Sequence, residues 1–118
     1  MPQLGELERA VMAALWGAGG PLTAKSILDA LGDRGLAVTT VLTVLSRLER
    51  KGMVRRRRDE RAHTYEAVST REEHVAELMR EALGTADDRD GALVRFVGAA
   101  SDEDVDALRR ALRSRRRG

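Results

Sequence analysis

Hydroxyl and guanidinium side chains that could contact a nucleic acid are concentrated between residues 39 and 61. Apolar residues in the first half of this stretch recur at the three- and four-residue spacing of a helix with one buried face. That face would contain Val41, Val44, Leu45 and Leu48. Serine and threonine can contact base edges or phosphates, and arginine can hold guanine. The exposed side of this predicted recognition helix would present Thr39, Thr40, Thr43, Ser46, Arg47 and Arg50.

A run of arginines follows the predicted recognition helix. After Gly52, which can adopt the left-handed conformation that ends helices, residues 53–58 and 62–68 are short enough to be two strands of a hairpin. Its tip would consist of Asp59, Glu60 and Arg61. Charged edge strands also prevent sheets from pairing, but five arginines within seven positions exceed that need. We therefore expect phosphate contacts, which are sensitive to salt, from Arg55, Arg56, Arg57, Arg58 and Arg61.

The distribution of charge is more informative than the net charge. The 118 residues include 21 basic and 19 acidic side chains, so the net charge is only +2. Residues 47–61 contain eight basic and three acidic side chains, whereas residues 69–106 contain four arginines and eleven carboxylates. A polyanion would therefore approach the first region and avoid the second.

The residues before the recognition helix complete a three-helix pattern. A first amphipathic helix is predicted from about residue 5 to residue 16, where glycines end it. Thr23 is suited to cap a short second helix that Gly32 would close, and residues 33–38 would form the turn into the recognition helix. Together with the hairpin, residues 1–68 are predicted to form a winged helix-turn-helix domain. The predicted fold class is therefore mainly α with a small β-hairpin.

Residues 69–118 are predicted to form a helical dimerisation region. Thr70 and Glu73 have the spacing of a capping box for a fourth helix, and two more helices would start near Asp90 and after Ser101. The terminal arginines would form a frayed basic tail. Short amphipathic helices cannot easily bury their apolar stripes alone, so a second copy of the chain is the simplest partner. The predicted dimerisation residues are Val75, Leu78, Met79, Leu83, Leu93, Phe96, Val97, Val105, Leu108 and Leu112.

The sequence gives little support for catalysis or metal binding. Without cysteine, the chain can form no disulfide, thiol nucleophile or cysteine-based metal site. His63 and His74 lack the denser ligand cluster that a metal needs, and no catalytic triad, phosphate loop or carboxylate pair is recognisable. We therefore expect a protein that is not an enzyme and has no cofactor. The absence of an apolar stretch of roughly 20 residues predicts a cytoplasmic protein that does not insert into membranes.

Four segments along the chain form a specific combination. They are LGELERAVMAALW at residues 4–16, TTVLTVLSRLERKGMV at 39–54, RAHTYEAV at 61–68 and ALVRFV at 92–97. In this combination the chain resembles the penicillinase and methicillin-resistance repressors of the BlaI/MecI type, a family that includes copper-responsive CopY members. The similarity extends over nearly the whole chain.

The resemblance implies a homodimeric repressor whose winged helices bind an inverted repeat in double-stranded DNA. Family-like contacts would come from the recognition helix and, in the wing, from Arg57, Arg58 and Arg61. In antibiotic-responsive members a membrane sensor protease cleaves within the helix that corresponds to ALVRFV, and the matching bond here joins Arg95 and Phe96. The residue before Phe is Asn in the staphylococcal members. Copper-responsive members carry a C-terminal cysteine motif, which this chain lacks.

Two other functions are compatible with a winged helix. The arginine hairpin could meet an acidic protein, which would make the chain a protein-interaction module. Alternatively, a small molecule bound between the C-terminal helices could set the affinity for DNA, as in ligand-sensing regulators of other classes. The combination of a hydroxyl-rich helix with an arginine hairpin favours DNA as the partner.

Overall fold

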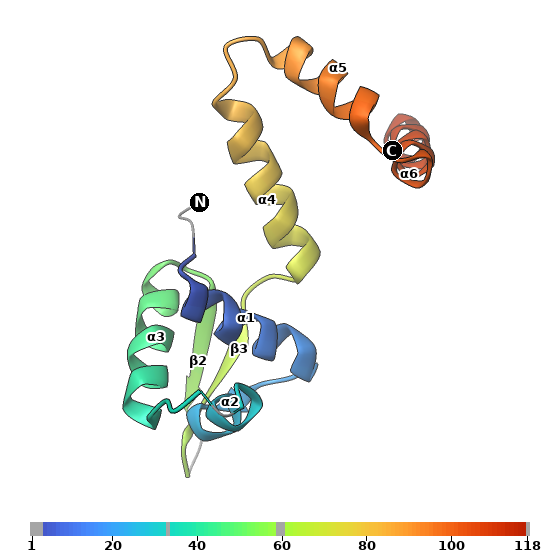
Figure 1. Ribbon diagram of the computed structural model, residues 1–118. Coiled ribbons are helices and arrows are strands. Elements are labelled where there is room, and N and C mark those ends of the chain that lie inside the picture. The colour runs from blue at the N-terminus through green and yellow to red at the C-terminus, as the bar shows by residue number, and fades with distance from the viewer. Residues whose placement is uncertain (1–3, 33, 59–60, 118) are drawn as a thin grey trace. The chain divides into compact units, whose positions relative to one another are not determined.

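The described residues form six helices and three short strands, which the computed structural model divides between two compact units (Figure 1). Residues 4–32, 34–58 and 61–117 are described. The first unit is Met1–Glu77 and the second is Leu78–Gly118. The helices are α1 (Glu6–Ala18), α2 (Ala24–Ala30), α3 (Val38–Arg50), α4 (Arg71–Gly84), α5 (Arg89–Ala99) and α6 (Asp102–Arg117), and the strands are β1 (Leu22–Thr23), β2 (Val54–Arg58) and β3 (His63–Ala67).

Local sequence signals determine where α2 begins and where α3 ends. The Thr23 hydroxyl accepts a hydrogen bond from the backbone N–H three residues later at 3.1 Å, which confirms the predicted cap of α2. Gly52 has a φ of 77°, and the backbone N–H of Met53 donates to the carbonyl oxygen of Leu48 at 3.0 Å. This geometry closes α3 at the predicted glycine. The predicted turn before α3 begins at Asp33, which lies outside the described residues.

The sheet contains one strand more than the sequence indicated. Its strand order is β1-β3-β2, and both pairings are antiparallel. In β1, Leu22 lies opposite Tyr65 and Thr23 lies opposite Thr64. The predicted hairpin is therefore confirmed as β2 and β3, and β1 adds a third strand that the sequence did not predict. A strand of two residues is too short to show an alternating pattern, and its pairing depends on residues far along the chain.

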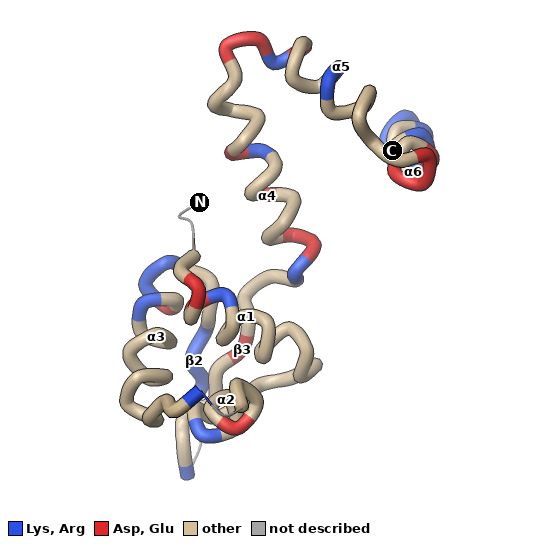
Figure 2. The backbone as a smooth tube through the Cα atoms, in the orientation of Figure 1, with Lys and Arg blue, Asp and Glu red and all other residues tan. Residues whose placement is uncertain are grey.

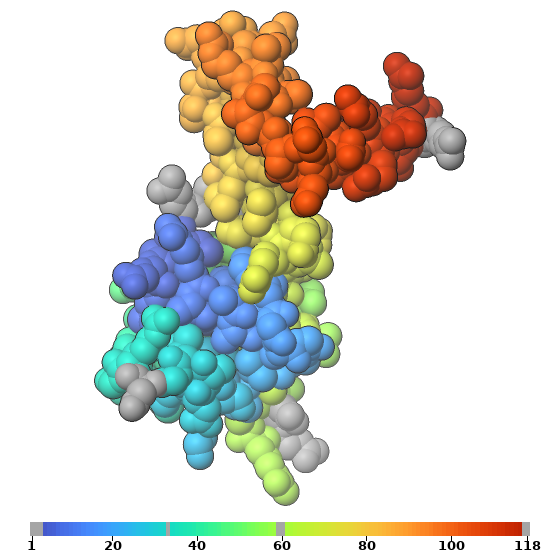
Figure 3. Space-filling view, turned by 45° about the vertical axis from the view of Figure 1, so that its right-hand side comes forward, coloured from blue at the N-terminus to red at the C-terminus, as the bar shows by residue number. Residues whose placement is uncertain are grey.

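One hydrophobic core lies between the helices and the sheet of the first unit. Fully buried side chains come from each of its three helices, including Met12 in α1, Ile27 in α2 and Leu45 in α3. Val54 and Tyr65 close the core from the hairpin. In the space-filling view, α1 and α2 form a continuous surface and the hairpin extends beyond it (Figure 3). Because α3 and β2 share this core, their exposed sides are held in a fixed relation.

Contacts of Trp16 hold the beginning of α4 against α1. The Trp16 indole N–H donates to the backbone oxygen of Ser69 at 2.9 Å. Its ring centroid lies 5.5 Å from that of the buried His74, and the Arg71 guanidinium lies 5.4 Å from the ring centroid. These contacts fix the point at which α4 leaves the winged-helix core.

The caps of the C-terminal helices agree with the sequence, but the predicted tail does not. Thr70 and Glu73 exchange two hydrogen bonds of 3.1 Å, and the Ser101 hydroxyl accepts from the backbone N–H of Asp104 at 3.1 Å. Helix α6 continues through Arg117, so the prediction of a frayed tail was wrong. Arginine favours helices, and its charge stabilises their C-terminal ends. No helix in the described part of the chain is both long and apolar enough to cross a membrane.

Candidate nucleic-acid interface

Helix α3 has one buried side and one exposed side. Its core residues are Val41, Val44, Leu45 and Leu48, as predicted. The other side carries all six residues that the sequence assigned to recognition, and each of them is exposed. Those six are Thr39, Thr40, Thr43, Ser46, Arg47 and Arg50. The structure thus brings them together on one accessible helix side, and their contact with DNA stays a prediction.

The exposed side of α3 is less polar than the six predicted residues suggest. The Thr43 hydroxyl donates to the backbone oxygen of Thr39 at 3.0 Å, so its proton is used within the helix. Leu42 is 41% exposed, because leucine at this position has no core to fill. Leu42 was not among the predicted contact residues, although an apolar residue that breaks the helical spacing of the core was a signal for it. The exposed side therefore offers apolar contacts as well as hydrogen bonds.

An ion pair fixes the C-terminal end of α3 to the beginning of α1. Lys51 Nζ donates to both carboxylate oxygens of Glu8, at 2.9 and 2.8 Å. The same carboxylate accepts from the backbone N–H of Gly5 at 3.0 Å, and Glu8 is 9% exposed. The hydrogen bond from Lys51, with that from Gly5, lowers the pKa of Glu8 below its ordinary value of 4.5. This contact joins the end of α3 to α1, and it was not predicted from the sequence.

The two faces of the hairpin hold different arginines. Residues directly opposite each other in an antiparallel pair share a face, and Arg56 lies opposite the buried Tyr65. On the other face, Glu66 Oε1 accepts from Arg55 at 3.0 Å and lies 3.0 Å from Nε of Arg57. Two of the predicted phosphate ligands are therefore partly neutralised by one carboxylate, a pairing that was not predicted from the sequence.

Basic residues of the first unit gather on β2 and on the end of α3 (Figure 2). Arg58 lies opposite His63 at the outer end of the hairpin, on the face away from Glu66, and both side chains are exposed. Arg61 is also exposed, whereas the predicted tip residues Asp59 and Glu60 lie outside the described residues. The hairpin arginines and the exposed side of α3 thus belong to one folded unit. A protein that inserts a helix into the major groove and binds the flanking phosphates needs these two groups in a fixed arrangement.

The two histidines occupy unrelated positions. His63 is exposed on the hairpin, whereas His74 is packed against Trp16. Among the described residues, no group of three or more His, Cys, Asp or Glu side chains could hold a metal ion.

The sequence pattern of one protein family spans almost the whole molecule. The penicillinase repressor pattern matches residues 4–114. The chain belongs to the penicillinase repressor family. Two relatives, each described as "Transcriptional regulator BlaI", come from the CDC 1551 / Oshkosh and ATCC 25618 / H37Rv strains of Mycobacterium tuberculosis. Each is 49% identical over 116 residues, which cover 95% of this chain and 84% of the relative. The chain is accordingly a transcriptional repressor of the BlaI type.

Solved structures confirm the fold class of this penicillinase repressor. A MarR family protein from Bacillus stearothermophilus aligns with a TM-score of 0.52 and 22% identity, over 98% of this chain and 75% of that chain. MepR, a transcription regulator of the Staphylococcus aureus multidrug efflux pump MepA, aligns with a TM-score of 0.52 and 20% identity, over 95% and 77%. At such low identity these matches establish a winged helix-turn-helix domain with C-terminal helices, and nothing more.

The apolar residues of the repressor's C-terminal helices are half-buried or exposed. None of the ten predicted dimerisation residues is buried within the chain, and Phe96 and Leu112 are 51% and 63% exposed. Those ten are Val75, Leu78, Met79, Leu83, Leu93, Phe96, Val97, Val105, Leu108 and Leu112. Arg95 and Phe96, at the predicted cleavage bond, lie inside α5 and are both exposed.

Proposed function

We propose that this repressor binds an inverted-repeat operator in double-stranded DNA as a homodimer. The observation that carries the proposal is the exposed side of α3, where six hydroxyl or basic residues accompany a basic hairpin within one folded unit. Each α3 would enter one major groove, and the hairpin arginines would bind the flanking phosphates. Bound across a promoter, the dimer would exclude the transcription machinery.

Dimerisation is supported by the uncovered apolar side chains of the C-terminal helices. Residues such as Met79, Phe96 and Leu112 are more than half exposed, which is costly for a run of large apolar groups in water. A second copy offers the same residues in return, so a symmetric interface would bury both sets. Two linked winged helices would then match the two halves of a palindrome.

The test begins with selection of genomic DNA fragments by the purified protein, followed by titration with the selected duplex. We expect a preferred palindromic site. Arg47→Ala should weaken binding to that site by about 1–3 kcal/mol if Arg47 holds a base, whereas Arg58→Ala should weaken binding to every duplex alike and reduce the salt slope by about one. Arg89→Ala, in the second unit, serves as the control. Failure to enrich any fragment would instead favour a protein-interaction module.

The derepression step that we propose is cleavage of the Arg95–Phe96 bond in α5 by a membrane sensor protease. Helix α5 contains Gly91 and Gly98, and glycine inside a helix costs about 0.5–1 kcal/mol relative to alanine. This helix should therefore unwind locally more easily than α4, and local unwinding exposes a peptide bond to a protease. Mass spectrometry of the repressor from cells treated with an inducing antibiotic should reveal fragments ending at Arg95. Intact repressor in fully derepressed cells would contradict cleavage.

A further inference from the structure

Helix α6 separates its charges along its length. Its first turns carry Asp102, Glu103, Asp104 and Asp106, and its remaining turns carry six arginines from Arg109 to Arg117. The tube view shows the acidic start and the basic remainder of this helix (Figure 2). The first half of α6 is therefore strongly negative, and the second half is strongly positive.

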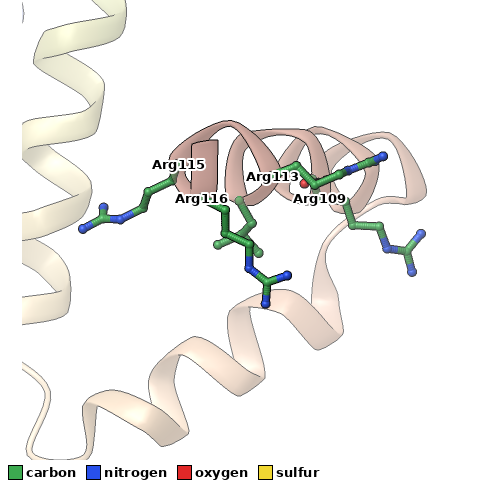
Figure 4. A pocket seen from close by; sticks show the side chains of 5 residues that line it. Arg109, Arg113, Arg115 and Arg116 are labelled. Atoms are coloured by element: carbon green, nitrogen blue, oxygen red, sulfur yellow. The ribbon is translucent and has the colours of Figure 1, made fainter. Parts of the chain in front are cut away.

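An apolar seam runs between these charges. Val105, Leu108 and Leu112 recur at helical spacing, and Leu112 is 63% exposed. Leu112 lines a hollow on α6 with the side chains of Arg109, Arg113, Arg115 and Arg116 (Figure 4). The hollow thus combines the apolar side chain of Leu112 with four arginine side chains, which suits an apolar side chain with a carboxylate beside it.

We infer that α6 pairs antiparallel with α6 of a second copy, an inference that rests on the proposed homodimer. A two-fold axis between Leu108 and Arg109 would set Val105 of one copy opposite Leu112 of the other. The same register would bring Asp102 of one copy near Arg113 of the other on one side of the seam, and Asp104 near Arg115 on the other side. Each contact would occur twice, as a symmetric interface requires.

Charge selects this orientation over its alternative. A parallel pair would set the four acidic residues of one copy against those of the other, and arginines against arginines. An exposed ion pair contributes little alone, but several pairs arranged along a seam act together, and opposed like charges strongly disfavour the wrong arrangement. The acidic half of one α6 is consequently the partner of the hollow on the other.

Three variants of the full chain test the orientation. The basic variant carries Asp102→Lys, Glu103→Lys and Asp104→Lys, and the acidic variant carries Arg113→Glu, Arg115→Glu and Arg116→Glu. The exchanged variant carries all six substitutions and keeps the net charge of the original chain. Sedimentation equilibrium at low and high salt gives the dimer dissociation constant, and circular dichroism monitors the helix content.

In an antiparallel pair, the basic and acidic variants each oppose like charges, so their dissociation constants should rise about tenfold or more at low salt and less at high salt. Mixing these two variants should restore a tight dimer. The exchanged variant should also dimerise, because each acidic half again meets a basic half. Since this variant contains every substitution, its dimerisation would show that none of them prevents folding.

Three outcomes would overturn the inference. In the first, the basic and acidic variants dimerise as tightly as the original chain. In the second, their mixture dimerises no more tightly than either variant alone. In the third, the exchanged variant is monomeric. If one of these outcomes is found and the original chain is a dimer, the proposed homodimer stands, but its interface lies elsewhere. A monomeric original chain would instead refute the homodimer itself.

Discussion

Glu66 is the residue that sets the effective charge of the wing. Its carboxylate oxygen lies 3.0 Å from Nε of both Arg55 and Arg57, so a phosphate that approaches either arginine must compete with a protein carboxylate. Arg58 projects from the other face, where Glu66 does not compete. Arg57 and Arg58, the two residues of β2 that the family resemblance assigns to DNA contact, should therefore differ, with Arg58 contributing more than Arg57 to DNA affinity.

Glu66→Gln should strengthen binding to all duplexes. The substitution removes one negative charge and releases two guanidinium groups for phosphates, which should raise affinity several-fold and steepen its salt dependence. Titration of operator and unrelated duplexes at several salt concentrations measures both effects. Glu6→Gln, which removes an exposed charge at the start of α1, is the matched control and should have a smaller effect. Weaker binding by Glu66→Gln would mean that Glu66 orients the arginines for DNA.

Leu42 should recognise a thymine methyl group. It is 41% exposed on α3, between Thr39 and Ser46 on the same side, and leucine can contact the C5-methyl of thymine but no polar base edge. Replacing thymines of the operator by uracil, one at a time, removes single methyl groups. At one position we expect affinity to fall about fourfold, from the roughly 0.8 kcal/mol of one buried methyl.

A variant separates this contact from effects of uracil on DNA shape. Leu42→Ala should bind the thymine operator more weakly and should lose its sensitivity at that one position, whereas Thr43→Ser removes a different methyl group and should retain it. If the original protein binds the fully uracil-substituted operator as tightly as the thymine operator, Leu42 has no such role.

Among the elements, those determined by local signals could be predicted from the sequence. The apolar spacing of α3, its end at Gly52 and the Thr70–Glu73 capping box all involve residues close together in the chain. The contacts that sequence reasoning missed join distant residues: β1 depends on β3, and Lys51 reaches Glu8. The spacing of apolar residues along the chain does not reveal such pairings. For the candidate site, the exposed residues of α3 were therefore predictable, but the ion pairs that modulate them were not.

The ion pair between Glu8 and Lys51 should make α3 sensitive to acid. Because the pKa of Glu8 is lowered in the folded protein, the pair stabilises the fold fully above the ordinary value of 4.5, and this contribution is lost as the pH falls through the lowered pKa. Glu8→Gln should reduce the free energy of unfolding by about 1–3 kcal/mol at neutral pH.

Urea denaturation at a series of pH values tests both statements. The difference between the original chain and Glu8→Gln should be constant near neutral pH and should shrink on acidification, whereas Glu6→Gln, at an exposed position, should show little difference at any pH. A difference that persists unchanged at low pH would show that packing rather than charge is responsible.

For the whole molecule, folding and assembly depend on different parts of the chain. Every buried residue among those described lies between Leu4 and His74, which places the core in the first unit. Beyond that unit the apolar residues of the helices are half-buried or exposed, and no side chain described there is buried. The first unit should therefore fold by itself, while the second should determine whether two recognition helices act together.

Removal of residues 85–118 should separate these two roles. The shortened chain should retain a single cooperative unfolding transition, because it keeps the core and all of α4. Its affinity for a full palindrome should fall by a factor of about 10² to 10⁴, since the two half-sites are no longer bound by linked units. On a duplex with one half-site, the original and shortened chains should bind with similar affinity, which provides the matched control. If the shortened chain bound the full palindrome as tightly as the original, the link between the two recognition helices would have to lie in the winged-helix unit or α4, and not in α5 and α6.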